Sequence, residues 1–198
     1  MRRILAIAIV TSVVLAFAAE RAEAQLPLAF VAGPTFSTIS SSEYDDTGSK
    51  TGFFAAVGTS FPLTETVSFN PYVGYVKKGT TFGDGDEEAS YDYIEIPLLV
   101  NVGFPLGETS SLGLSAGPAI GFQISCDEDG FDCTEYENHK GTEFSFMGTA
   151  GVSFQTSSTG AFTFGAAYDV GLTDIYEDLD YKTRTIFLFL AYSTVIGG

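Results

Sequence analysis

Most of the chain after residue 24 alternates apolar residues with small or polar ones. In the segment 94–104, one face is formed by Ile94, Ile96, Leu98, Val100, Val102 and Phe104. A period of two is typical of β-strands, and no convincing 3.6-residue helical period competes with it. The pattern predicts eight strands, over residues 28–40, 51–61, 67–79, 91–104, 111–124, 143–155, 161–172 and 183–194.

The length of these segments favours strands that cross a membrane. Globular strands usually have about 5 to 6 residues, whereas about 9 to 11 tilted residues span the hydrocarbon of a bilayer. Aromatic residues near the segment ends are typical of two interfacial girdles, and they are Phe53, Phe61, Tyr75, Tyr91, Phe104, Phe122, Phe154 and Tyr168. Only a closed sheet satisfies every backbone group in lipid. We therefore predict an all-β fold, an eight-stranded antiparallel up-and-down transmembrane β-barrel.

Periodicity alone does not say which face of a barrel points outward. A soluble periplasmic, lipocalin-like barrel would show the same alternation with its apolar faces inward. The strand at 183–194 is also ambiguous, because Phe187 and Phe189 face opposite to Ile186, Leu188 and Leu190. Both questions stay open on the sequence alone.

The N-terminus has the features of a cleaved signal peptide. Arg2 and Arg3 precede the apolar run 4–19, and Ala22-Glu23-Ala24 provides the small-x-small pattern of a cleavage site. The apolar run is shorter than the about 20 residues of a spanning helix. The sequence predicts a signal peptide over 1–24 and a mature barrel domain over 25–198, in the outer membrane of a bacterium with both mature termini in the periplasm.

Acidic residues are concentrated in four long gaps between the predicted strands. The chain carries 25 acidic and 9 basic residues, a formal net charge of −16, and most of the acids lie in the segments 40–50, 80–90, 126–142 and 173–182. The short gaps are 62–66, 105–110 and 156–160. Outer-membrane barrels alternate long external loops with short periplasmic turns in this way. The charge argues against nucleic acid as a partner, because phosphate binding requires clustered bases.

Three segments resemble a known family. Tyr93-Ile94-Glu95-Ile96-Pro97-Leu98-Leu99 is similar to the "YxEIPLL" strand of the PorT-like and OmpA-like outer-membrane β-barrel domain of bacteria. The segment 169–175 resembles the family's "GLxDI" motif, and 183–188 resembles its closing "R-x-I-x-L" strand. Members commonly end with an aromatic residue shortly after a tyrosine, whereas Tyr192 is followed by none. The resemblance implies an eight-stranded outer-membrane barrel.

Candidate chemistry is sparse. The single histidine, His139, lies in a long gap and is interpreted as a solvated loop residue, so no catalytic residues and no cofactor are predicted. Cys126 and Cys133 are the two cysteines and are predicted to form a disulfide rather than part of a zinc site. The acidic clusters are weaker candidates for a divalent cation, and their residues are Asp84, Asp86, Glu87, Glu88, Asp127 and Asp129.

The predicted inner face carries four polar residues, namely Lys78, Glu95, Asn101 and Asp169. A charge that faces a narrow lumen needs a partner, so we expect an ion pair between Lys78 and Glu95. Because eight strands leave an interior only wide enough for side chains, a plug is favoured over an open channel.

Three functions remain. The leading hypothesis is a non-enzymatic outer-membrane barrel whose acidic external loops serve envelope structure, surface interaction or adhesion. The alternatives are a narrow pore for ions or small solutes, lined by Glu95, Asn101 and Asp169, and the soluble periplasmic binding barrel. The expected partners are outer-membrane lipid and lipopolysaccharide, through bridging divalent ions or through Lys77, Lys78 and Arg184. Other envelope proteins are possible partners, and the barrel is expected to be a monomer.

Overall fold

A computed structural model describes residues 26–41, 47–83, 87–133, 140–156, 160–176 and 181–196. Eight long strands make up most of this part of the chain. They are β1 (Leu26–Ser41), β2 (Thr47–Thr59), β4 (Val67–Phe82), β5 (Glu87–Pro105), β6 (Ser110–Glu128), β8 (Thr142–Gln155), β9 (Gly160–Gly171) and β10 (Tyr181–Ile196). Two short strands, β3 (Phe61–Pro62) and β7 (Phe131–Asp132), pair with β4 and β6. The described residues hold no helix that is long and apolar enough to span a bilayer.

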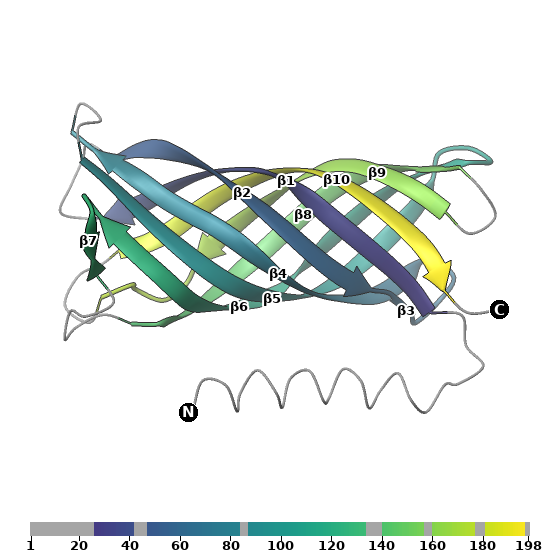
Figure 1. Cartoon of the computed structure of the whole chain (residues 1–198). Helices are drawn as coiled ribbons and strands as arrows, with labels where there is room; N and C mark the ends of the chain where they lie inside the picture. Colours follow the sequence, from purple (N-terminus) through teal and green to yellow (C-terminus); the bar gives the residue numbers. More distant parts are fainter. Residues whose placement is uncertain are drawn as a thin grey trace.

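The eight long strands close into a barrel. Each pairs antiparallel with its neighbours in the order β1, β2, β4, β5, β6, β8, β9, β10, and β10 pairs again with β1. The closing pair is long, running from Leu26 opposite Ile196 to Ser41 opposite Tyr181 (Figure 1). The predicted eight-stranded antiparallel barrel is confirmed. Each predicted strand lies within a few residues of an observed one, and the observed strands are mostly longer.

The apolar faces point out of the barrel. Large apolar side chains are exposed on every long strand, among them Phe30, Phe53, Val73, Val100, Leu114, Phe146, Phe164 and Leu188. On β10, Ile186, Leu188 and Leu190 are exposed while Phe187 is 3% exposed, which resolves the facing of this strand. The alternative of a soluble barrel with inward apolar faces is therefore wrong. A belt of this kind is suited to contact with lipid.

The apolar belt covers only part of the length of the barrel. On β5 the outward residues are apolar from Ile94 to Phe104, and the next outward residues are Asp92 and Ser90. On β10 the residue beyond Ile186 is the exposed Arg184. The strands thus continue past the belt at one end, where β1–β2, β4–β5, β6–β8 and β9–β10 are connected, and we call this the long-loop end. The opposite, short-turn end carries the connections 60–66, 106–109 and 156–159.

A charge placed in the middle of the belt tests this orientation of the strands. Val100 is 45% exposed and lies midway along the apolar face of β5. We expect Val100→Arg to lower the free energy of unfolding by about 2–4 kcal/mol, the usual cost of arginine at a bilayer midplane. Denaturant unfolding in liposomes measures it. Ser49→Arg, on the outward face of β2 beyond the belt, is the matched control and should cost about 1 kcal/mol or less. Equal costs would contradict the assignment of the belt.

Candidate functional site: a charge cluster inside the barrel

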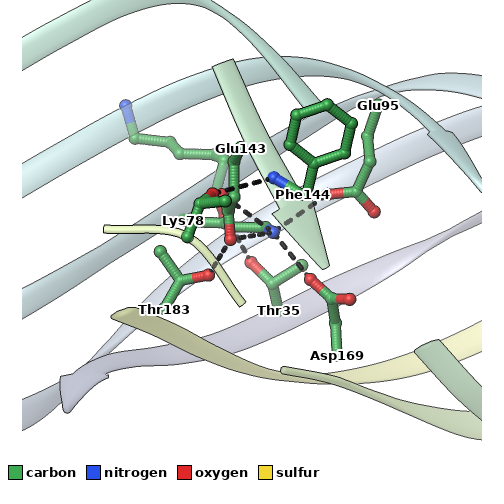
Figure 2. Close-up of polar contacts among 9 residues, drawn as sticks. Thr35, Lys78, Glu95, Glu143, Phe144, Asp169 and Thr183 are labelled. Carbon is green, nitrogen blue, oxygen red and sulfur yellow. Dashed lines mark hydrogen bonds and ion pairs between the residues drawn. The ribbon is translucent and has the colours of Figure 1, made fainter. Parts of the chain in front are cut away.

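Four charged residues meet inside the barrel near the edge of the apolar belt. Lys78 on β4 places its Nζ 2.9 Å from Oε2 of Glu95 on β5 and 2.8 Å from Oδ2 of Asp169 on β9. The same ammonium lies 3.4 Å from both carboxylate oxygens of Glu143 on β8. All four residues, which we call the Lys78 cluster, are at most 5% exposed. Figure 2 shows the carboxylates of three different strands directed at one ammonium group.

Strand alternation explains why these side chains share the lumen. Ile94, Phe144 and Tyr168 are outward residues, so Glu95, Glu143 and Asp169, each next to one of them in the chain, must point inward. In the ring of eight strands β4 and β9 are diametrically opposite. The ion pair of Lys78 with Asp169 therefore crosses the whole width of the barrel. The lysine has a long flexible side chain, and it joins β4 to β8 and β9, neither of which is a neighbour of β4 in the sheet.

Further groups support the cluster. The Thr183 hydroxyl donates to Oε1 of Glu143, and the Lys78 ammonium lies 5.5 Å from the centroid of the Tyr93 ring. One ammonium faces three carboxyl groups, so acidic groups exceed bases within the Lys78 cluster. Oδ1 of Asp169 is also buried without a hydrogen-bond partner among the described protein atoms. Buried carboxyl groups are costly unless each is paired or hydrogen-bonded, so the lysine is essential to this arrangement.

A tyrosine layer covers the cluster on its long-loop side. It consists of Tyr91, Tyr93, Tyr176 and Tyr181, each at most 9% exposed. The hydroxyls of Tyr91 and Tyr176 donate to Oε1 of Glu128 over 2.9 and 2.6 Å. Together with the Lys78 cluster, this layer fills the lumen at the long-loop end of the described barrel.

The disulfide of Cys126 with Cys133 belongs to the same buried region. Its Cα atoms are 5.3 Å apart, and both cysteines are at most 3% exposed. The bond joins the end of β6 to the residue that follows β7. Glu128 lies close to both sulfur atoms, but disulfide sulfurs do not supply the thiolates that bind zinc. The predicted disulfide is present.

A cavity of about 320 Å³ lies on the other side of the cluster, toward the short-turn end. Glu95 is part of its wall, and Asn101 lies farther along β5, where its Oδ1 accepts a hydrogen bond of 3.0 Å from Ser115. The cavity exists because small residues occupy many inward positions at this level. Among them are Gly74, Gly103, Gly113, Gly151, Ala56 and Ala167.

The structure brings together three of the four lumen residues that the sequence indicated. Lys78, Glu95 and Asp169 meet, whereas Asn101 is apart from them. Sequence reasoning missed Glu143 and Thr183. Glu143 precedes the outward Phe144 and shares the inward parity of Ser145, but it stands at the end of its strand, next to a long acidic gap.

The acidic candidates for a divalent cation are only partly described. Glu88 forms a 2.7 Å ion pair with Lys50, and its backbone N–H donates to Oδ1 of Asp129. Oδ1 of Asp127 accepts a hydrogen bond from the backbone N–H of Gly130. Glu87 is exposed at the start of β5. Asp84, Asp86 and His139 lie outside the described residues. No geometry in the described part assembles these carboxylates around one point.

Comparison with known proteins identifies the family. The family described as outer membrane protein beta-barrel domain matches residues 19–177, most of the chain. The chain belongs to this family. This outer-membrane barrel is also similar in fold to Neisserial surface protein A, with a TM-score of 0.58, 16% identity, and coverage of 85% of this chain and 97% of the other.

Two further solved structures share the fold. OprG of Pseudomonas aeruginosa has a TM-score of 0.55 and 8% identity, with coverage of 90% of this barrel and 99% of OprG. AlkL, solved in lipid bilayers, has a TM-score of 0.51 and 10% identity, with coverage of 89% and 92%. No curated protein matches the chain in sequence. The outer-membrane barrel family is thus shown, while the PorT-like resemblance stays a prediction.

Two adjacent lysines on β4 allow a controlled test of the cluster. We expect Lys78→Met to lower the free energy of unfolding by about 3–5 kcal/mol, because it leaves buried carboxylates without their cation. Lys77 points outward beside Lys78, 3.6 Å from Asp92 and one-third exposed. Lys77→Met should therefore cost about 1 kcal/mol or less. Unfolding by urea in liposomes measures both variants, and a small effect of Lys78→Met would show that the cluster is not needed for stability.

Proposed function

We propose that this protein is a closed, non-enzymatic outer-membrane barrel that acts through its external loops in envelope structure, surface interaction or adhesion. The observation that carries the proposal is that side chains fill the lumen at its long-loop end. The Lys78 cluster joins opposite walls of the barrel, and the tyrosine layer packs against it on the long-loop side. A barrel closed in this way presents its surface, rather than its interior, to the outside of the cell.

The orientation in the membrane follows from the general architecture of outer-membrane barrels, which have long external loops and short periplasmic turns. Under this rule the long-loop end is external and both mature termini are periplasmic, after removal of a signal peptide over 1–24. Exposed acids lie at the long-loop end, among them Glu87, Glu88, Asp127 and Asp129. Acidic loops keep this surface soluble and disfavour anionic partners such as nucleic acids.

Lipid is the first partner of the proposed barrel. Arg184 and Lys77 point outward at the edge of the belt, at the level expected for the phosphates of outer-membrane lipid and lipopolysaccharide. The described surface gives no reason for an oligomer, and we propose a monomer. Other envelope proteins could bind to the loops.

A narrow pore is the second candidate, and the lumen cavity favours it. The cavity extends from Glu95 toward the short-turn end and is lined in part by Asn101. For conduction, however, the Lys78 cluster and the tyrosine layer would both have to open. That would break several buried ion pairs and hydrogen bonds at once.

Planar-bilayer recording distinguishes the closed barrel from the pore. We expect the purified protein to insert without conductance steps, because charged and aromatic side chains fill its lumen. A variant in which Lys78, Tyr91 and Tyr93 are replaced by serine serves as the positive control and should conduct if it still migrates as a folded barrel before boiling. Regular conductance steps from the unaltered protein would favour the pore.

The surface role is tested on the loops themselves. We expect that Glu87→Gln and Glu88→Gln with Asp127→Asn and Asp129→Asn will reduce retention of expressing cells on cationic surfaces, because they remove negative charge from the external end. Cell retention on cationic and anionic surfaces is the measurement. The matched control is Glu65→Gln with Glu108→Gln, two acids in the short turns. If the control has the same effect as the loop variant, the external loops are not the interacting surface.

A further inference from the structure

The lumen cavity is a blind pocket that opens at the short-turn end. Its wall reaches from Glu95, beside the Lys78 cluster, to Ser111, Ser153 and Ser193. These three serines also line a second pocket at the short-turn rim, which includes Pro105, Gly107 and Glu108. The two spaces therefore adjoin at these serines, and the opposite end of the cavity lies at the charge cluster. With about 320 Å³, the cavity is at the lower end of the about 300–1,000 Å³ typical of ligand pockets.

Much of the cavity wall is apolar and aromatic. It includes Phe54, Tyr72, Leu99, Met147, Phe187 and Phe189. Phe54 and Phe187 contact each other edge to face, with ring centroids 5.0 Å apart. Polar groups become frequent toward the mouth, where serines and threonines take over. A molecule with an apolar body thus finds complementary walls inside the barrel.

One acidic group interrupts this apolar wall. Glu95 belongs both to the Lys78 cluster and to the cavity wall, while Glu143 and Asp169 do not line the cavity. Oε2 of Glu95 binds Lys78, and Figure 2 shows its other oxygen pointing away from the lysine. The Lys78 cluster holds three carboxyl groups and one ammonium group. A second positive charge near Glu95 would therefore bring the number of basic groups closer to the number of acidic ones.

We propose that this cavity binds a small molecule with a protonated amine at one end and a short apolar body. The ammonium group lies against the Glu95 carboxylate at the closed end, and the apolar body packs among the aromatic residues. Aromatic faces also attract cations, and Tyr72 and Phe54 line the same cavity as Glu95. The ligand enters from the short-turn side, which is the periplasm in the proposed orientation. An anion of the same size is excluded by the surplus of carboxyl groups.

Met147 makes this proposal directly measurable. It lines the cavity, and the chain has just one other methionine, at position 1. Labelling with methyl-¹³C methionine therefore gives one internal signal, which reports on the cavity of the full barrel in lipid nanodiscs. We titrate butylammonium, butanol and butyrate, three short probes of similar size and different charge. The expected result is a saturable shift of the Met147 signal with butylammonium, about tenfold weaker binding of butanol, and no shift with butyrate.

Two cluster variants assign the preference to Glu95. Glu95→Gln should reduce the about tenfold preference for butylammonium over butanol to near one, because the charged partner of the amine is gone. Glu143→Gln removes a carboxyl group from the same cluster but not from the cavity wall, so it should keep the preference. Equal responses to amine and alcohol in the unaltered protein would overturn the proposal. Equal loss of the preference in both variants would also overturn it.

A third variant covers the case in which Glu95→Gln fails to fold, which the loss of the barrel's change in gel mobility on heating would reveal. Thr149→Phe places a larger side chain in the cavity from β8, at a position that is not part of the Lys78 cluster. If the Thr149→Phe variant folds into a barrel, its Met147 signal should no longer respond to any of the three probes. If butylammonium still shifts the Met147 signal in the blocked barrel to the same extent, it binds outside the cavity and the proposal is wrong.

Discussion

The absence of water in the bilayer core is the constraint on which the rest of this structure depends. Each backbone N–H and C=O group at that depth needs a partner within the chain, and a sheet closed on itself supplies one for every strand. The pairing of β10 with β1 completes this ring. Closure also fixes what the side chains can do. Outward positions face lipid and are apolar, while inward positions face a narrow lumen that side chains can span.

The narrow lumen explains why one lysine can organise the interior. In an eight-stranded ring the opposite wall is within reach of a single extended side chain, so Lys78 on β4 contacts Asp169 on β9. Its ammonium also contacts acids on β5 and β8, which places charges from half of the strands around one atom. In a wider barrel the same four residues would face water separately. The size of the ring therefore turns isolated polar positions into one cluster.

The barrel is filled unevenly along its axis, and side-chain size accounts for this. Beyond the cluster, on the long-loop side, the inward positions carry large residues such as Tyr91 and Tyr181. On the short-turn side the inward positions carry glycine, alanine and serine, as at Gly113, Gly151 and Ser153. Large side chains thus fill the lumen at one end, and small ones leave a cavity toward the other. A plug and a pocket result from the same alternation of residues, with the Lys78 cluster between them.

Much of this architecture could be predicted from sequence because the period of two sets both the strands and the faces. The pattern around Ile94 and Leu98 marked the lipid-facing side of β5 and thereby placed Glu95 inside. The direction of that assignment required the assumption of a membrane, and the faces of the strand around Phe187 stayed undecided until its neighbours were known.

Glu143 shows a different limit. It stands at the end of its strand, beside a long acidic segment, where parity alone does not separate an inward charge from a loop acid. The meeting of Lys78 with Glu143 and Asp169 depends on the shear of the barrel, because β4 is not a neighbour of β8 or β9, and alternation along one strand holds no information about that. Local pattern thus determines which way each side chain points, whereas the closure of the ring determines which of them meet.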